Sequence, residues 1–198
     1  LAVQGTINAA MMALEDGIAA NLAGGTHHAF PDHGEGFCVL NDVAVAIRLL
    51  MQSCWIRRAL VIDLDVHQGN GTAAIFSDAP NIFTFSMHGA KNYPFKKPPS
   101  TLDVPLPDAT RDATYLGTLR QHLPAVIDEA QPDLIFYLAG IDVMEHDRYG
   151  RTALSREGLH ARDGYVLETI AAAGIPVTLL LSGGYAATPE LTADLHAV

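Results

Sequence analysis

Three short apolar segments, each followed by polar residues, constrain the fold of this chain more than any other feature. They cover residues 59–66, 133–138 and 175–181, and in the first of them the carboxylates appear only near the end. A short continuous apolar run of this kind is typical of a strand that is buried on both faces as it leaves a parallel sheet. Residues 81–86 form a fourth candidate strand, which ends in Met87 and His88.

Helical segments separate the expected strands. The first is Ala- and Leu-rich and stops at Gly24-Gly25. Asn41 or Asp42 suits the N-cap of the second helix, and the last helix begins at Thr188-Pro189. The helices are expected over residues 4–23, 43–52, 72–76, 113–130 and 155–173, with a break near Gly164 in the last of these, and again from residue 188.

Strands that alternate with helices predict an α/β fold, an open and mainly parallel sheet with helices on both faces. The Pro-rich residues 94–107 are interpreted as a long surface loop. Because the 198 residues contain no internal repeat and no linker, we expect one domain over residues 1–198.

Composition excludes several classes of protein. Hydrophobic residues make up 49% of the chain and charged residues 17%, which argues against a disordered chain. The net charge of −10 and the lack of a basic cluster argue against nucleic-acid binding, and no apolar run approaches the roughly 18 residues of a membrane span. The two cysteines, Cys38 and Cys54, lack metal-type spacing, so a reducing compartment, the cytoplasm, is expected.

Polar residues gather where the predicted strands end. Asp63, Asp65 and His67 follow one strand, Asp142 follows another and Tyr185 a third. Ligands of open α/β sheets bind beyond the carboxyl ends of the strands, and Asp65 and His67, two residues apart, can point the same way. A third acid would complete an Asp/His/Asp site with one position open for water or substrate, as catalytic zinc needs. Taken singly, each Asp is more often a helix cap or turn former, and a single His is more often structural.

Two further clusters carry possible chemistry. His27 and His28 lie in a Gly-rich loop, where they could chelate a metal, act as an acid/base pair, or simply be solvated. Gly183-Gly184-Tyr185 could bring the backbone close to a substrate and aim a phenol at it. Taken alone this second cluster is a weak signal, since buried tyrosines after strands are common.

Together these motifs resemble the zinc-dependent histone deacetylases. The sequences of residues 63–71 and 145–150 are most similar to the class IV branch and its bacterial relatives. The resemblance implies an arginase/deacetylase-like fold and runs from about Gly24 to the C-terminus. The motifs occur in the family's order: Gly24-Gly25-Thr26-His27-His28-Ala29, Gly36-Phe37-Cys38-x-x-Asn41-Asp42, Ile62-Asp63-Leu64-Asp65-Val66-His67-Gln68-Gly69-Asn70-Gly71, Ala139-Gly140-Ile141-Asp142, Glu145-His146-Asp147-Arg148-x-Gly150 and Ser182-Gly183-Gly184-Tyr185.

The resemblance implies a role for each matching position. It makes His28 the general base and acid, His27 its electrostatic partner, and Asp63 the carboxylate that holds His27. Tyr185 matches the phenol that hydrogen-bonds the oxyanion. The implied zinc ligands are Asp65, His67 and Asp142.

The resemblance also implies a substrate channel and a second cation. Phe37 matches one wall of the acyl-lysine channel, Tyr93 is a candidate for the other, and the glycines Gly36, Gly183 and Gly184 border it. A monovalent cation, K⁺ or Na⁺, is implied at a structural site formed around Asp63, Asp65, His67, Ser86 and Met87.

Three features depart from the family pattern. Asn70 stands where many members have the aspartate that backs the second histidine, which should leave His28 less basic. The loop after Tyr93 lacks the usual Gly-rich run, and only about one helix precedes Gly24, so we expect the chain to lack the N-terminal part of the domain. The remaining histidines are expected to be structural or on the surface, with His88 the best candidate for an exception: His33, His88, His122, His146, His160 and His196.

The function expected from these residues is zinc-dependent hydrolysis of an acyl amide, which removes acetyl or a longer acyl group from a lysine side chain of a peptide or protein. Two alternatives stay open: a deacetylase of small acetylated amines such as polyamines, and an inactive domain that binds acyl-lysine. The acidic surface would attract any cationic substrate at low salt and does not choose between them. A binuclear manganese hydrolase is disfavoured, because Asp65 and Asp142 alone supply too few bridging carboxylates once Asp63 is assigned to His27.

Overall fold

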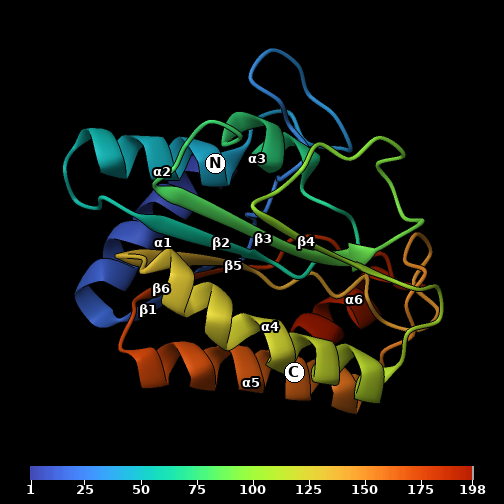
Figure 1. Cartoon of the computed structure of the whole chain (residues 1–198). Coiled ribbons are helices and arrows are strands. Elements are labelled where there is room, and N and C mark those ends of the chain that lie inside the picture. Colours follow the sequence, from blue (N-terminus) through green and yellow to red (C-terminus); the bar gives the residue numbers. More distant parts are fainter. Residues whose placement is uncertain (198) are drawn as a thin grey trace.

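The computed structural model describes residues 1–197, and within them the chain forms a six-stranded sheet with the strand order β1-β6-β5-β2-β3-β4. Each pair of neighbouring strands in this sheet is parallel (Figure 1). The expected α/β fold with an open parallel sheet is confirmed. The strands are β1 (Ile18–Asn21), β2 (Ala59–Asp63), β3 (Ile82–Gly89), β4 (Leu102–Leu106), β5 (Leu134–Leu138) and β6 (Val177–Leu180).

Helices cover both faces of the sheet and create two hydrophobic cores. α1 and α2 lie on one face, while α4 and α5 lie on the other (Figure 1). Along β2, Leu60 and Ile62 belong to the core under α4 and α5, whereas Ala59 and Val61 belong to the core under α1 and α2. Both faces of this strand are therefore buried, which is why its sequence is continuously apolar. The helices are α1 (Ala2–Asp16), α2 (Asp42–Gln52), α3 (Asn70–Ile75), α4 (Asp112–Ala130), α5 (Arg156–Ala173) and α6 (Pro189–His196).

Local capping residues fix the start of two expected helices. Asn41 is the N-cap of α2, and its side chain accepts a hydrogen bond from the backbone N–H of Ala44. Thr188 caps α6 in the same way, with Pro189 in the first turn. These side chains satisfy backbone donors that the first helical turn leaves free.

The first expected helix is too long and hides a strand. α1 ends at Asp16, Gly17 follows with φ of 88°, and Ile18–Asn21 pairs in parallel with β6. The Ala-rich sequence permits a helix there, but the positive φ ends it and pairing with β6 decides the conformation of the next residues. The continuous-helix prediction for residues 4–23 was wrong because tertiary pairing outweighs a weak local preference.

Two smaller expectations were also wrong. Residues 94–107 are not entirely loop, because Leu102–Leu106 forms the edge strand β4 beside β3. Pro105 is compatible with that strand because an edge strand does not need every N–H for pairing. No break occurs in α5 near Gly164, which faces open space and leaves the helix continuous from Arg156 to Ala173.

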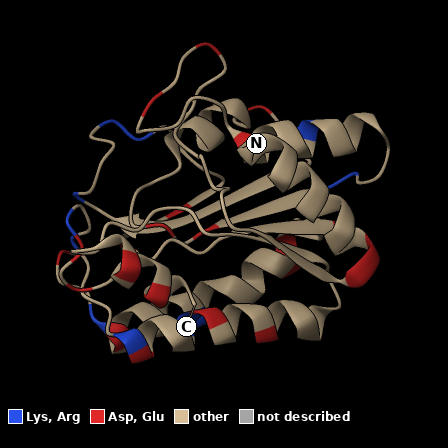
Figure 2. Cartoon of the chain, turned by 180° about the vertical axis from the view of Figure 1, so that it is seen from behind, with Lys and Arg blue, Asp and Glu red and all other residues tan. Residues whose placement is uncertain are grey.

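Charged residues lie mostly on loops and outer helix faces, but a few carboxylates lie at the ends of the central strands (Figure 2). Those at the strand ends include Asp63, Asp65 and Asp142, all of them buried. Within residues 1–197, none of the helices combines the length and the apolar character needed to cross a membrane.

Candidate active site

Three buried side chains converge at the carboxyl ends of β2 and β5. Asp65 and His67 follow β2, and Asp142 follows β5. Each offers one potential ligand atom, and these three atoms lie within 4.8 Å of one another. The pairing of β2 with β5 brings residues that are far apart in the sequence to one point at the edge of the sheet.

The geometry of this cluster suits a metal ion. His67 Nδ1 lies 3.0 Å from Asp65 Oδ1 and 3.0 Å from Asp142 Oδ2. Burial and the nearby charge of Asp65 raise the pKa of Asp142 to about 7. Burial opposes a charge on His67, but hydrogen bonds to Asp142 and Asp65 outweigh it and raise the pKa of His67 to about 10. Both buried carboxylates thus share the same nitrogen, Nδ1 of His67, as their hydrogen-bond partner. Two carboxylate oxygens and one imidazole nitrogen form a set of ligands that zinc accepts.

Backbone donors hold the two carboxylates from the outer side. Asp142 Oδ1 accepts from Val66 N at 2.9 Å, and Asp65 Oδ2 accepts from Gly183 N at 2.8 Å. A Cβ on Gly183 would collide with both carboxylates, so only glycine fits there. Gly183 and Gly184 therefore lie beneath the cluster, and they line a hollow that includes Asp65 and Tyr185.

The two adjacent histidines have different partners. His27 Nδ1 contacts Asp63 Oδ2 at 2.7 Å, as predicted, whereas His28 Nδ1 contacts Asn70 Oδ1 at 2.6 Å. The Nε2 atoms of the two rings are 3.1 Å apart. Asp63 is thus engaged with His27, which agrees with the argument against a second bridged metal.

Burial and neighbouring charges drive the pKa values of these two histidines apart. Burial would lower the pKa of His27, but the negative charges of Asp63 and Asp65 overcome it and raise the pKa to about 9. Burial and the adjacent charge of His27 lower the pKa of His28 to about 3. At neutral pH His27 is an imidazolium, and His28 is a neutral ring that accepts from it.

Sequence reasoning missed Glu35. Its Oε1 accepts a hydrogen bond from Asn70 Nδ2 at 2.8 Å and another from the Tyr93 hydroxyl. The side chain thereby links the loop after His28 to the loop that begins at Tyr93. Glu35 also lies 3.4 Å from His33 Nε2 through its Oε2, but no local pattern points to its role, because Asn70 and Tyr93 are distant in the sequence.

Tyr185 faces the cluster from the loop after β6. Its ring centroid lies 6.5 Å from that of His67, and burial, with Asp65 and Asp142 nearby, raises its pKa well above the usual value. Asp147 anchors this loop, because its Oδ2 accepts from Tyr185 N at 2.7 Å. The sequence motif that contains Asp147 was recognised, but its contact with Tyr185 was not.

Aromatic rings surround the opening above the cluster. A cavity of about 600 Å³ is lined by Phe37 and Tyr93, the two residues expected along a substrate channel, and also by Tyr149, which the sequence did not single out. Their role as channel walls stays a prediction. Tyr149 lies 4.8 Å from Tyr185 and 6.4 Å from Phe37, measured between ring centroids. Gly36 has φ of 50° and lies so close to His28 that a Cβ would overlap its ring.

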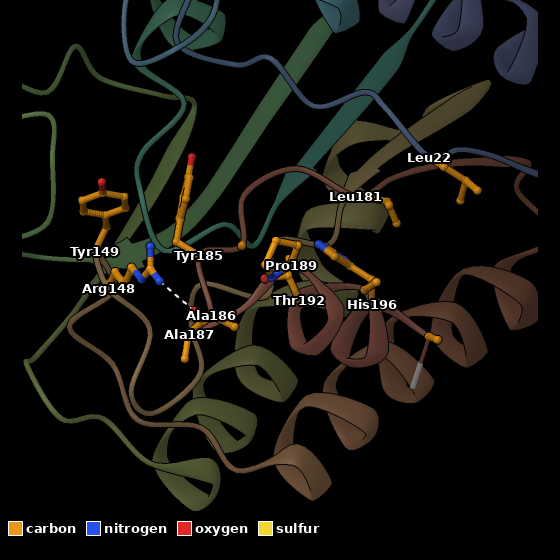
Figure 3. Close-up of a pocket in the computed structure, with 13 residues that line it drawn as sticks. Leu22, Arg148, Tyr149, Leu181, Tyr185, Ala186, Ala187, Pro189, Thr192 and His196 are labelled. Carbon is orange, nitrogen blue, oxygen red and sulfur yellow. Dashed lines mark hydrogen bonds between the residues drawn. The ribbon is translucent and has the colours of Figure 1, made fainter.

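A second cavity, of about 750 Å³, lies on the other side of Tyr185, between the loop after β6 and α6. Figure 3 shows Arg148 and Tyr149 at one end of it and Leu22 at the other, with His196 between them and Arg148 donating to the Ala187 carbonyl. The lining is mostly apolar. The backbone of Arg148 also donates to the Tyr185 carbonyl, at 3.2 Å, so this segment supports the Tyr185 loop from both sides.

The residues expected around a monovalent cation lie beside the cluster. Ser86 and Met87 are buried at the end of β3, next to β2. Ser86 Oγ lies 2.9 Å from His88 Nδ1, and burial lowers the pKa of His88 to about 4. His88 is thus a buried, uncharged structural residue, and the cation site itself stays a prediction.

An open parallel sheet with a buried Asp-His-Asp cluster at its carboxyl edge defines a class: α/β proteins built around a candidate metal centre. Within that class the chain belongs to the histone deacetylase family, because residues 1–197 match the model of the histone deacetylase domain.

Two of three similar proteins carry deacetylase names. The chain is 51% identical over 185 residues to an uncharacterized protein of Picosynechococcus sp., an alignment that covers 93% of the chain. It is 35% identical over 186 residues to histone deacetylase 2 of Arabidopsis thaliana, and 32% identical over 201 residues to a probable deacetylase of Methanothermobacter thermautotrophicus, covering 92% and 93% of the chain. The alignments span 62%, 48% and 59% of the lengths of these three relatives.

Proposed function

We propose that residues 1–198 form one catalytic domain that hydrolyses an acyl amide and releases acetyl or a longer acyl group from a lysine side chain. One observation carries the proposal. Asp65 and His67 of the Asp-His-Asp cluster line one hollow together with His27, His28 and Tyr185, and the aromatic-lined cavity shares His28, His67 and Tyr185 with that hollow. Amide hydrolysis requires a polarised carbonyl, an activated water and a proton for the leaving amine, and this set of groups can meet all three needs.

We assign Asp65, His67 and Asp142 as ligands of a zinc ion. Zinc held there would polarise the amide carbonyl and lower the pKa of a bound water toward roughly 7. A monovalent cation, K⁺ or Na⁺, near Ser86 and Met87 belongs to the same proposal, as a structural support for the end of β3.

We assign His28 as the group that takes the proton from water and returns it to the leaving amine. His28 Nδ1 is engaged with Asn70, so Nε2 carries the free electron pair of the ring. His27, held as an imidazolium by Asp63, stabilises negative charge that develops nearby.

We assign Tyr185 as the donor to the oxyanion of the tetrahedral intermediate. Burial raises the pKa of its phenol, so the hydroxyl keeps its proton at neutral pH and can donate it in a hydrogen bond. Such a donor acts on charge that appears only in the transition state, and its loss costs about 10²–10³ in rate. Phe37, Tyr93 and Tyr149 would line the path of the acyl-lysine stem.

Zinc content and Tyr185→Phe turnover test this proposal together. The zinc-loaded protein should bind about one zinc per chain and hydrolyse an acetyl-lysine peptide, and Tyr185→Phe should lower kcat about 10²–10³-fold. Tyr165→Phe, on α5 and away from the site, is the matched control and should leave kcat unchanged.

Three results would contradict or redirect the proposal. Absence of zinc binding, or full turnover by Tyr185→Phe, would contradict the mechanism. Tight binding of the peptide without turnover would favour an acyl-lysine binder. Faster turnover of an acetylpolyamine than of the peptide would favour a small amine as substrate.

A further inference from the structure

We propose that Glu35 is a positioning residue that fixes the proton of His28 through the amide of Asn70. This inference rests on the proposed function, because it concerns the residue assigned as the base of the same site. The carboxylate of Glu35 does not touch His28 or the metal cluster. Glu35 acts indirectly, through its hydrogen bond to Asn70 and the hydrogen bond from His28 to Asn70.

The direction of each hydrogen bond follows from the donors and acceptors available. An ionised carboxylate only accepts, so the Asn70 group that faces Glu35 at 2.8 Å must be the NH₂. The carbonyl oxygen of the same amide then faces His28 Nδ1 at 2.6 Å, and an oxygen there can only accept. His28 therefore carries its proton on Nδ1 and leaves Nε2, which accepts from His27, unprotonated, and this is the tautomer that a base needs.

The N–H that His27 directs at His28 Nε2 favours this tautomer from one side, but an asparagine by itself could not secure it on the Nδ1 side. A free amide can rotate by half a turn and present its NH₂ to His28, which would favour the opposite tautomer. Glu35 removes that freedom by accepting from the NH₂. Its hydrogen bond to the Tyr93 hydroxyl lowers the pKa of Glu35 and keeps the carboxylate ionised.

The position of Glu35 allows this role. Its side chain is about one third exposed, and its backbone forms an antiparallel bridge with Cys38 that closes the loop around Gly36. Tyr93, its other partner, packs edge-on against His28 with ring centroids 5.1 Å apart. Glu35 thus touches both groups that contact the outer face of His28, and it supplies the negative charge that Asn70 lacks.

Ring ¹⁵N chemical shifts of His28 test the inference without depending on activity. In the full chain, with His28 assigned by comparison with His28→Gln, Nδ1 should show the shift of a protonated nitrogen and Nε2 that of a bare one. In Glu35→Ala the two shifts should move toward each other as tautomers mix. Asp78→Ala removes an exposed carboxylate away from this loop, and it should leave both shifts unchanged. Unchanged shifts in a folded Glu35→Ala protein would overturn the inference.

Kinetics in two backgrounds separate positioning from simple support of the loop. In the wild-type background, Glu35→Ala should lower kcat about tenfold with little change in KM, at the low end of the effect of partners that orient site residues. In the Asn70→Asp background a carboxylate contacts His28 directly, so Glu35→Ala should no longer lower kcat. Glu35→Gln keeps an acceptor oxygen and should restore most of the activity.

The outcomes are distinguishable. Equal losses of kcat in both backgrounds would overturn the inference. Glu35 would then act by stabilising its loop or by holding Tyr93, and the kinetics of Tyr93→Phe would distinguish these two roles. A wild-type protein that binds zinc but does not hydrolyse acyl-lysine would refute the proposed function, while the ¹⁵N shifts would still report on Glu35.

Discussion

The two adjacent histidines divide the site into two halves that are held in different ways. In the buried half, His27 is fixed by the carboxylate of Asp63, and its pKa is raised to about 9. In the mouth half, His28 is fixed by the neutral amide of Asn70, stays uncharged, and depends on a loop that carries Glu35. The buried half comprises His27, Asp63, Asp65, His67 and Asp142, and the mouth half comprises His28, Asn70, Glu35, Phe37, Tyr93 and Tyr149.

This difference shows how two adjacent histidines acquire opposite states: Asp63 and Asp65 raise the pKa of His27, whereas burial and the charge of His27 lower that of His28. The pKa of His27 lies near 9 and that of His28 near 3, although one peptide bond joins the residues. Charge and burial secure the buried half, whereas directional hydrogen bonds secure the mouth half. We therefore expect substitutions in the buried half to have the larger effects, mainly on kcat, and those in the mouth to have smaller ones.

The largest effect is expected from Asp142→Ala, which removes one of the three candidate ligands. Zinc content should fall below one tenth of the wild-type value, and kcat/KM should fall by more than about 10³, beyond the 10–100-fold cost of losing an outer partner. A chelator should abolish wild-type activity, and added zinc should restore it. Asp128→Ala, an exposed carboxylate on α4, is the control. Retained zinc with full activity would refute the assignment.

Asp63→Asn tests the charge that distinguishes the two histidines. The substitution keeps the shape of the side chain but removes the negative charge beside His27, so His27 should become neutral and kcat should fall about 100-fold. Steady-state kinetics with a zinc assay measure the effect. If kcat changed less than twofold while zinc stayed bound, the charge of His27 would have no part in the reaction.

Asp147→Ala tests whether the Tyr185 loop belongs with the buried half. Asp147 accepts from the backbone N–H groups of Tyr185, Tyr149 and Gly150 at 2.7–2.9 Å. Its loss should let the phenol drift and lower kcat about tenfold, since misplaced donors stabilise the oxyanion less. Glu145→Ala, in the same loop and exposed, is the matched control. Equal effects of both substitutions would mean that loop charge, and not anchoring, matters.

The smallest effect is expected from Tyr149→Ala at the mouth. The ring packs against Tyr185 and Phe37, so its loss should raise KM two- to tenfold, which corresponds to the roughly 0.5–1.5 kcal/mol of an aromatic contact, and should leave kcat within about twofold. Tyr149→Phe keeps the ring and should behave as wild type. If Tyr149→Ala lowered kcat as much as Asp63→Asn does, the two halves of the site would not differ in the way proposed.

The sequence by itself determined the parallel sheet and the composition of its carboxyl edge. The buried strands could be predicted because burial on both faces demands a continuous apolar run, and the caps Asn41 and Thr188 because their signals are local. The polar residues after β2, β5 and β6 could be predicted to meet, since parallel strands end at one edge.

Only the tertiary structure decided the features that depend on distant contacts. Ile18–Asn21 is a strand because β6 pairs with it, although its Ala-rich sequence equally permits a helix. Asn70 contacts His28 across 42 positions and Glu35 across 35, and these contacts assign the His28 tautomer. Hydrophobic period and capping are properties of neighbouring residues, whereas the direction of a hydrogen bond between loops is set only when the folded chain brings their side chains together.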